Sequence, residues 1–363
     1  MNRHKVTVAA TGLASLILMA IAAPCRTVSA AAKPEATADA ALVNAMEAEL
    51  QRAMTSFGKT ASDAQPKPYF LSYAVSDSDI LGIAAQFGAI TASHESRRRT
   101  ADVELRIGTP AEDNTHGDHR NSAITTVPLP LTDDSDAIER SLWFATNRGY
   151  GKALDSYLQV KTEQQVRAKE DDASPDFSSE KPVTALLPAA PPLAVDQPAW
   201  EARLRELSSI FKQYPDVYFS TVALQARTET DYLVSSEGTK VATPNYQARL
   251  IIVARTRAAD GMDLFRDETF EAPDAAHLPD QKTIRNKVIA LAKSVTALRE
   301  APVTEPFNGP AILSGRAAAV FFHEVLGHRL EGQRQRGDEE GETFTKLLGK
   351  QILPTFLSVA DDP

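Results

Sequence analysis

"VYFSTVALQARTETDYLVSSEGTKVATPNYQARLIIVARTRAADG" occupies residues 217–261, and this stretch decides the fold class that we expect. Valine, isoleucine, threonine and aromatic residues, which favour strands, alternate with polar residues along it. Polar turns that contain glycine interrupt the alternation at residues 236–238 and 258–261. The stretch therefore predicts consecutive β-hairpins.

Helices are predicted on both sides of these hairpins. Apolar residues recur at steps of three and four over residues 41–55 and 280–299, and residues 135–170 and 200–211 have helical patterns as well. Three short β-rich pieces in residues 69–107 predict a small antiparallel sheet. The sequence thus predicts an α+β fold.

Changes in composition divide the chain into five segments. We interpret them as a signal peptide (1–30), an N-terminal mixed α/β domain (35–172), a connector rich in proline and alanine (173–200), a middle region of β-hairpins and a helix (201–308), and the start of an incomplete, β-rich catalytic domain (309–363). We expect the connector to be ordered or semi-extended.

The first 30 residues have the pattern of a secretory signal peptide. Arg3 and Lys5 precede an apolar stretch over residues 6–23, and small residues lead to a cleavage site after Ala30. The stretch is short for a membrane span and contains polar residues, so an uncleaved anchor is the weaker alternative. We expect export to the periplasm or cell envelope, with no stable membrane anchor after cleavage. Lipidation of Cys25 is left open.

Charge argues against one class of partner. The formal net charge is −9, and it becomes about −12 once the three positive residues of the signal peptide are removed. Arg97, Arg98 and Arg99 form the only basic run, which we interpret as a solvated strand edge. A basic stripe with interleaved aromatic residues is absent from the sequence, so we expect no nucleic-acid partner.

Two of the seven histidines, His323 and His328, lie close together in residues 321–332, "FFHEVLGHRLEG". Neutral imidazole is the commonest metal ligand in proteins, and a neighbouring carboxylate such as Glu324 can act as a general base on a metal-bound water. This combination is typical of helical zinc peptidases. The alternative interpretation is that these are polar residues on an alanine-rich helix without a shared role.

The residues before the histidines predict that both lie on one helix. A short apolar strand over residues 311–313, an N-cap at Ser314 and helix formers from Arg316 onward mark its start. Five steps along an ideal α-helix separate the two rings by roughly 140°. One wide turn of the π type, with about 4.4 residues, reduces this angle to roughly 50°. We predict this distortion beside Gly327, where it costs least.

The text around the motif resembles the TldD/PmbA family of metallopeptidases, also called gyrase-modulator proteins. The family pattern couples H-E-x-x-x-G/H with a following L-E-G, as in residues 321–332. Residues 341–363 resemble the family's next segment, and residues 231–244 and 248–270 resemble its middle hairpins. The similarity spans about residues 218–363 and is strongest at the motif.

The resemblance implies a zinc (Zn²⁺) site and a reaction. His323 and His328 would bind the zinc, and Glu324 would be the base that activates water against a peptide carbonyl. Glu331 would orient His328 from outside the metal shell or serve as a third ligand. The implied substrate is a peptide or an unfolded protein segment, and the implied assembly is a homodimer or a heterodimer with a family member.

The chain departs from the family pattern at two places. Gln333 stands where the family commonly has an aspartate, and the cysteine that completes the family's zinc site in a later β-rich region is not present in these residues. A catalytic zinc normally has three protein ligands. We expect the chain to be a fragment of a longer protein; alternatively, Glu331 completes the site, or the chain binds metal poorly.

The predicted function is that of a zinc-dependent metallopeptidase. One alternative is a non-catalytic partner subunit or an inactive fragment of a heteromeric peptidase of the TldD/PmbA type. Another is an envelope scaffold in which the motif is fortuitous.

A second pair of histidines receives a structural interpretation. His116 and His119 have the H-x-x-H spacing, with Asp113 and Asp118 nearby, but their surroundings are polar and turn-like. We therefore predict a solvated loop here.

Overall fold

The computed structural model describes residues 40–60, 65–164, 175–335 and 343–360. The predicted signal peptide lies outside these residues, as does Cys25. Among the described residues, every helix is too short or too polar to cross a membrane.

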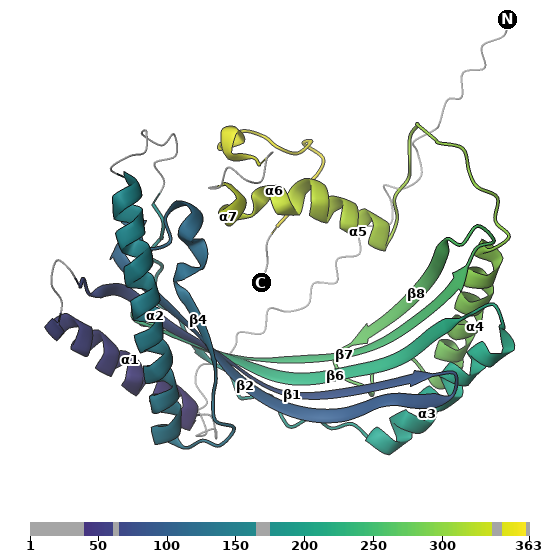
Figure 1. Ribbon diagram of the computed structural model, residues 1–363, viewed down its shortest axis with the longest axis horizontal. Helices are drawn as coiled ribbons and strands as arrows, with labels where there is room; N and C mark the ends of the chain where they lie inside the picture. Colours follow the sequence, from purple (N-terminus) through teal and green to yellow (C-terminus); the bar gives the residue numbers. More distant parts are fainter. Residues whose placement is uncertain (1–39, 61–64, 165–174, 336–342, 361–363) are drawn as a thin grey trace, which may run out of the picture. The chain divides into compact units, whose positions relative to one another are not determined.

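An eight-stranded sheet runs through the described part of the chain (Figure 1). Its order is β3 (Glu112–Asp113), β2 (Ala89–Thr109), β1 (Pro68–Gln86), β6 (Phe219–Ser235), β7 (Lys240–Arg257) and β5 (Thr184–Leu186), while β4 (Ile124–Pro128) also pairs with β2 and β8 (Asp263–Ala272) with β7. All pairs are antiparallel except that of β5 with β7. The hairpins predicted in residues 217–261 are confirmed as β6, β7 and β8.

Four long helices accompany the sheet, and the α+β fold class is confirmed. They are α1 (Ala40–Thr60), α2 (Ser135–Gln164), α3 (Gln197–Ser209) and α4 (Gln281–Leu298). The starts of α3 and α4 have the expected chemistry: the side chains of Asp196 and Asp280 accept hydrogen bonds from the backbone N–H groups of Ala199 and Thr283.

The small sheet predicted for residues 69–107 is in fact one hairpin, β1–β2, of the larger sheet. β1 pairs along its other edge with β6, from Ser72 opposite Ser235 to Ala85 opposite Val222. The segments 35–172 and 201–308 therefore contribute strands to the same sheet. Pairing of this kind joins residues about 150 positions apart in the chain, and no local pattern encodes it.

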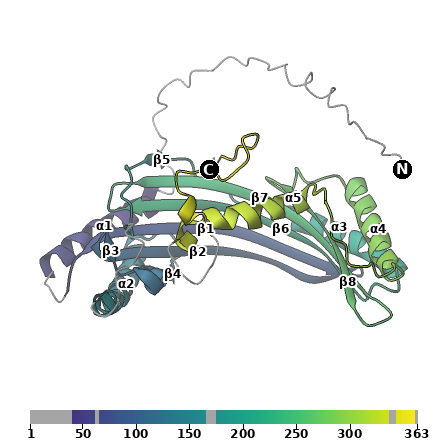
Figure 2. The same cartoon turned by 90° about the horizontal axis from the view of Figure 1, so that it is seen from above.

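Two hydrophobic clusters lie on one face of the sheet. The helices that pack on them, α1 and α2 for one cluster and α3 and α4 for the other, lie at opposite ends of the strands (Figure 2). One packs α1 and α2 against residues such as Leu71, Tyr73 and Val75 of β1. The other packs α3 and α4 against Leu81 and Ile83 of the same strand. Since these β1 positions are all odd-numbered, strand alternation directs them to one face.

A belt of charged residues separates the two clusters on this face. Asp77 and Asp79 of β1 lie opposite Arg99 and Arg97 of β2. The Arg99 side chain is 1% exposed; it pairs with Asp77 at 2.5 Å and with Asp133 at 2.9 Å. The prediction of a solvated strand edge is therefore wrong for Arg99, because its guanidinium is buried against the loop of residues 130–133, where it donates to the carbonyl oxygens of Pro130 and Thr132. It holds for Arg97 and Arg98, which are exposed.

The last described segment contains helices and turns. Residues 309–335 and 343–360 include no strand, and the short strand predicted at residues 311–313 is absent, with Ile312 98% exposed. This prediction is wrong because no partner strand among the described residues pairs with these residues.

Candidate metal centre

The histidine motif lies on a run of short helices. α5 (Arg316–Phe322) continues into the π-helix η3 (His323–Gly327), then into α6 (His328–Leu330), and α7 (Gly332–Gln335) follows. The N-cap is Gly315, at φ 53°, which has no side chain to form a capping hydrogen bond. The cap predicted at Ser314 is therefore misplaced by one residue.

The π-helix lies where the sequence analysis places a wide turn. It brings the ring centroids of His323 and His328 to 4.3 Å, with an angle of 66° between the ring planes. Gly327 itself has right-handed helical φ and ψ, and a Cβ at this position would meet only Nδ1 of His323, at 3.7 Å. An alanine would thus fit here, so the backbone conformation does not require glycine.

Three side chains converge at the wide turn. One ligand atom from each of His323, Glu324 and His328 lies within 4.8 Å of the others, and among the described residues only these three form a possible metal cluster. Oε2 of Glu324 lies 3.7 Å from Nε2 of His328. The side chains of Glu324 and His328 are 61% and 27% exposed, so water can reach the cluster.

Glu331 lies beside this cluster and contacts His328 from the other side of its ring. Oε1 of Glu331 lies 2.9 Å from Nδ1 of His328, and Nε of Arg334 donates to Oε2 at 2.5 Å. The hydrogen bond from His328, reinforced by that from Arg334, holds the pKa of Glu331 below its ordinary value. Both carboxylate oxygens thus have protein partners.

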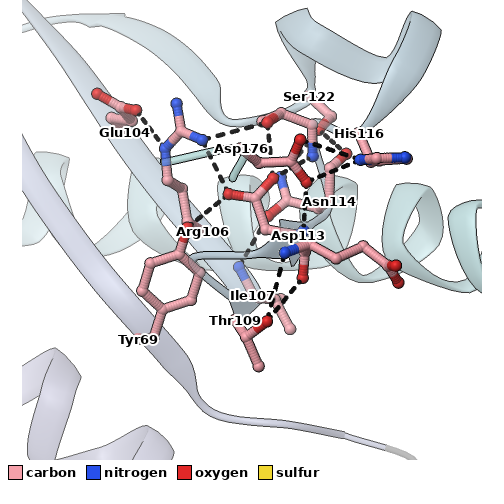
Figure 3. A network of polar contacts seen from close by, with 12 residues as sticks. Tyr69, Glu104, Arg106, Ile107, Thr109, Asp113, Asn114, His116, Ser122 and Asp176 are labelled. Carbon is pink, nitrogen blue, oxygen red and sulfur yellow. Dashed lines mark hydrogen bonds and ion pairs between the residues drawn. The ribbon is translucent and has the colours of Figure 1, made fainter. Parts of the chain in front are cut away.

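A second polar cluster surrounds Asp113 and overturns the prediction of a solvated loop (Figure 3). Asp113 and Asn114 are fully buried. The hydroxyl of Tyr69 donates to Asp113 at 2.5 Å, Nη1 of Arg106 at 2.8 Å, and the backbone N–H of Thr115 at 2.7 Å. The polar groups of this loop form hydrogen bonds with one another and with the ends of the strands, so its polar sequence does not make it a solvated loop.

The connector supplies a member of this cluster that the sequence analysis missed. Asp176 accepts from the backbone N–H of Asp113 at 2.8 Å, and its carboxylate lies 3.0 Å from Nδ1 of His116. The next residue, Phe177, packs against Phe70 with centroids 4.6 Å apart and ring planes tilted by 46°. Phe177 is the only aromatic residue between positions 158 and 199, and this was the available signal.

The Asp113 cluster has the properties of a structural anchor. Burial would raise the pKa of Asp113, but the hydrogen bonds from Thr115, Tyr69 and Arg106 outweigh it and lower the pKa. Burial and the bond to Asp113 raise the pKa of Tyr69. Donors occupy the buried carboxylate, and His119 points to Glu163 of α2 at 3.4 Å rather than to His116. These two histidines are not brought together as a metal pair.

Among known proteins, this chain is similar to solved structures in its fold. No protein-family model and no curated protein sequence matches the chain. Among solved structures, it is similar to a protein proposed to modulate a DNA gyrase from Thermotoga maritima, with a TM-score of 0.39 and 10% identity over 71% of this chain and 50% of that one.

Two further solved structures are similar at the same level. They are TldE from Thermococcus kodakarensis (TM-score 0.36, 9% identity, 69% of this chain and 47% of that one) and a protein from Bacteroides thetaiotaomicron, also proposed to modulate DNA gyrase (TM-score 0.38, 11% identity, 67% and 48%). The chain spans about half the length of these proteins. Their names are those of the family that the motif resembles.

Proposed function

We propose that this chain carries the histidine helix of a zinc-dependent metallopeptidase. The observation that supports this most is the π-helix, which turns two histidines five residues apart toward each other and keeps a carboxylate beside them. A regular α-helix would point the two rings in divergent directions, as the spacing predicts. π-type turns are rare and concentrate at functional sites.

The residues present fit zinc in their donor chemistry. His323 and His328 offer two imidazole nitrogens, the ligand type that helical zinc sites use. When bound, zinc supplies Lewis acidity, which lowers the pKa of a coordinated water and polarises a peptide carbonyl. The exposed position of the cluster leaves room for water and for an extended peptide.

Glu324 is the proposed general base. Its carboxylate lies within the cluster and is mostly exposed, so it is free to accept a proton from water. The same carboxylate would then return the proton to the leaving amine. His323 and His328 orient the reacting groups by holding the metal, and neither needs to change its protonation state during the reaction.

The third zinc ligand is the open element of this proposal. Glu331 has both carboxylate oxygens engaged by His328 and Arg334, which favours an orienting role over ligation. Glu324 is close enough to act as a ligand instead of a base. A ligand from another part of the complete protein or from a partner chain is the third possibility.

Substrate, assembly and location extend the proposal. A peptide or unfolded segment suits an exposed cluster, and a homodimer or heterodimer would follow the resembled family. We place the protein in the periplasm or cell envelope on the strength of its N-terminal residues. Cell fractionation that recovers the full-length precursor in the cytoplasm would contradict this location.

The decisive experiment separates zinc binding from catalysis. Zinc per chain is measured by elemental analysis on the wild type, His328→Ala and Glu324→Gln, and cleavage of an unfolded protein is followed on the same samples. We expect about one zinc per wild-type chain and its loss in His328→Ala. Glu324→Gln should keep zinc and lose activity by a factor of about 10²–10⁴, because it removes only the base.

His277→Ala is the matched control for this experiment. His277 is an exposed histidine that pairs with Asp274, outside the cluster, so its replacement should change neither zinc content nor cleavage. Loss of zinc in Glu324→Gln would show that Glu324 is a ligand and not the base. A folded wild type that binds no zinc and cleaves nothing would favour the alternative, a non-catalytic partner subunit or an inactive fragment.

A further inference from the structure

Three side chains spaced three residues apart form a line that leads away from the candidate metal centre. They are His328, Glu331 and Arg334, and their contacts are 2.9 Å and 2.5 Å long. The backbone permits this line because the helix stops at Leu330. Glu331 has ψ 121°, and α7 starts a new turn at Gly332, which carries Arg334 back toward the carboxylate.

The line matters because an imidazole has two nitrogens and can present only one of them to a metal. The nitrogen that binds is set by the hydrogen bond that the other one makes. An ionised carboxylate only accepts, so Nδ1 of His328 must carry the proton that it shares with Glu331. Nε2, which faces Glu324, is then the nitrogen with a free lone pair.

The carboxylate needs a second contact to hold this orientation. Glu331 and His328 are both partly exposed, and a partly exposed glutamate side chain has several accessible rotamers. Nε of Arg334 donates to the second oxygen and fixes the plane of the carboxylate.

We propose that Arg334 is a positioning residue of the metal centre: it holds Glu331, which holds Nδ1 of His328 and so presents Nε2 to the metal. The metal in this inference rests on the proposed function, whereas the contacts among Arg334, Glu331 and His328 do not. Removing the Arg334 side chain should therefore change which ring nitrogen of His328 carries the proton, and it should not unfold the chain.

Two measurements on Arg334→Ala test the proposal. The first is the tautomer of His328 in metal-free protein, read from the nitrogen chemical shifts of the ring at a pH where the imidazole is neutral. The second is zinc affinity, measured by competition with a chelator. We expect the wild type to be mainly the Nδ1–H tautomer and the variant to be a mixture, with zinc binding weakened about tenfold.

Arg329→Ala is the matched control, because it removes the same charge from the same run of helices. The Arg329 guanidinium lies over the ring of Phe344, 5.8 Å from its centroid, whereas the line to the metal centre is formed by His328, Glu331 and Arg334. It should leave the tautomer and the affinity at wild-type values. Circular dichroism on each variant checks that the fold is retained.

The outcomes separate the two proposals. An unchanged tautomer in Arg334→Ala overturns the positioning role, and so does an equal loss of affinity in Arg329→Ala, which would indicate a general effect of charge. If the wild type binds no zinc, the proposed function fails, while the tautomer shift still decides the role of Arg334.

Discussion

Asp113 illustrates what decides the role of a single residue in this protein. Its carboxylate is fully buried and accepts hydrogen bonds from Tyr69, Arg106 and Thr115. A buried charge is tolerated only when such donors surround it. Its neighbours in sequence are polar, and the same letters would suit a solvated loop. The difference comes from Tyr69 and Arg106, which arrive on β1 and β2.

Replacement of this carboxylate should produce a pH-dependent loss of stability. Because the folded-state pKa of Asp113 is lowered, its ionised form stabilises the protein above the unfolded pKa of about 3.9, and this contribution disappears as the pH falls through the folded pKa. Asp113→Asn should therefore lower the free energy of unfolding by about 3 kcal/mol at pH 7 and by clearly less at pH 3. Urea unfolding at both pH values measures this.

Asp102→Asn on the neighbouring strand β2 is the control for that measurement. Asp102 is exposed and accepts a hydrogen bond from the hydroxyl of Thr126, so the substitution should cost little at either pH. If Asp113→Asn lowers the free energy of unfolding equally at pH 7 and pH 3, the shape of the side chain, and not its charge, stabilises the site.

At the scale of the element, β2 shows how alternation acts on three identical residues. Arg97 and Arg99 point to the face that carries the helices, and Arg98 points to the other face. Of the first two, only Arg99 lies under cover, where it pairs with Asp77 and Asp133. Alternation thus predicts the faces, while the loop of residues 130–133 decides which arginine is buried.

Arg99→Met should be far more damaging than Arg98→Met. The first substitution leaves Asp77 without its closest partner in a covered position, and we expect a loss of about 3 kcal/mol in the free energy of unfolding. The second changes an exposed side chain and should stay within about 0.5 kcal/mol of the wild type. Thermal and urea unfolding of both variants compare them directly, and similar losses would contradict the assigned burial.

At the scale of the molecule, β1 joins the two halves of the described chain. It pairs with β2 on one edge and with β6 on the other, and it contributes side chains to both hydrophobic clusters. Tyr232 and Val234 of β6 likewise belong to the cluster under α1 and α2. Each cluster therefore contains residues from both predicted segments.

We expect neither segment 35–172 nor segment 201–308 to fold alone. Separation would open a long strand edge on β1 and on β6 and would remove part of each hydrophobic cluster. Amide spectra of the isolated segments should lack the dispersion of a folded protein, whereas mixing them should restore it in part. A dispersed spectrum for either segment alone would show that it is an independent domain.

The sequence by itself determined the features that depend on nearby residues. Helices, hairpins and the convergence of His323 and His328 follow from spacing along a few turns of one helix or strand. Only the tertiary structure decided the β1–β6 pairing, the burial of Arg99 and the meeting of Asp113 with Asp176, 63 residues later. The physical reason is that periodicity defines the faces of an element but does not specify which distant element will cover them.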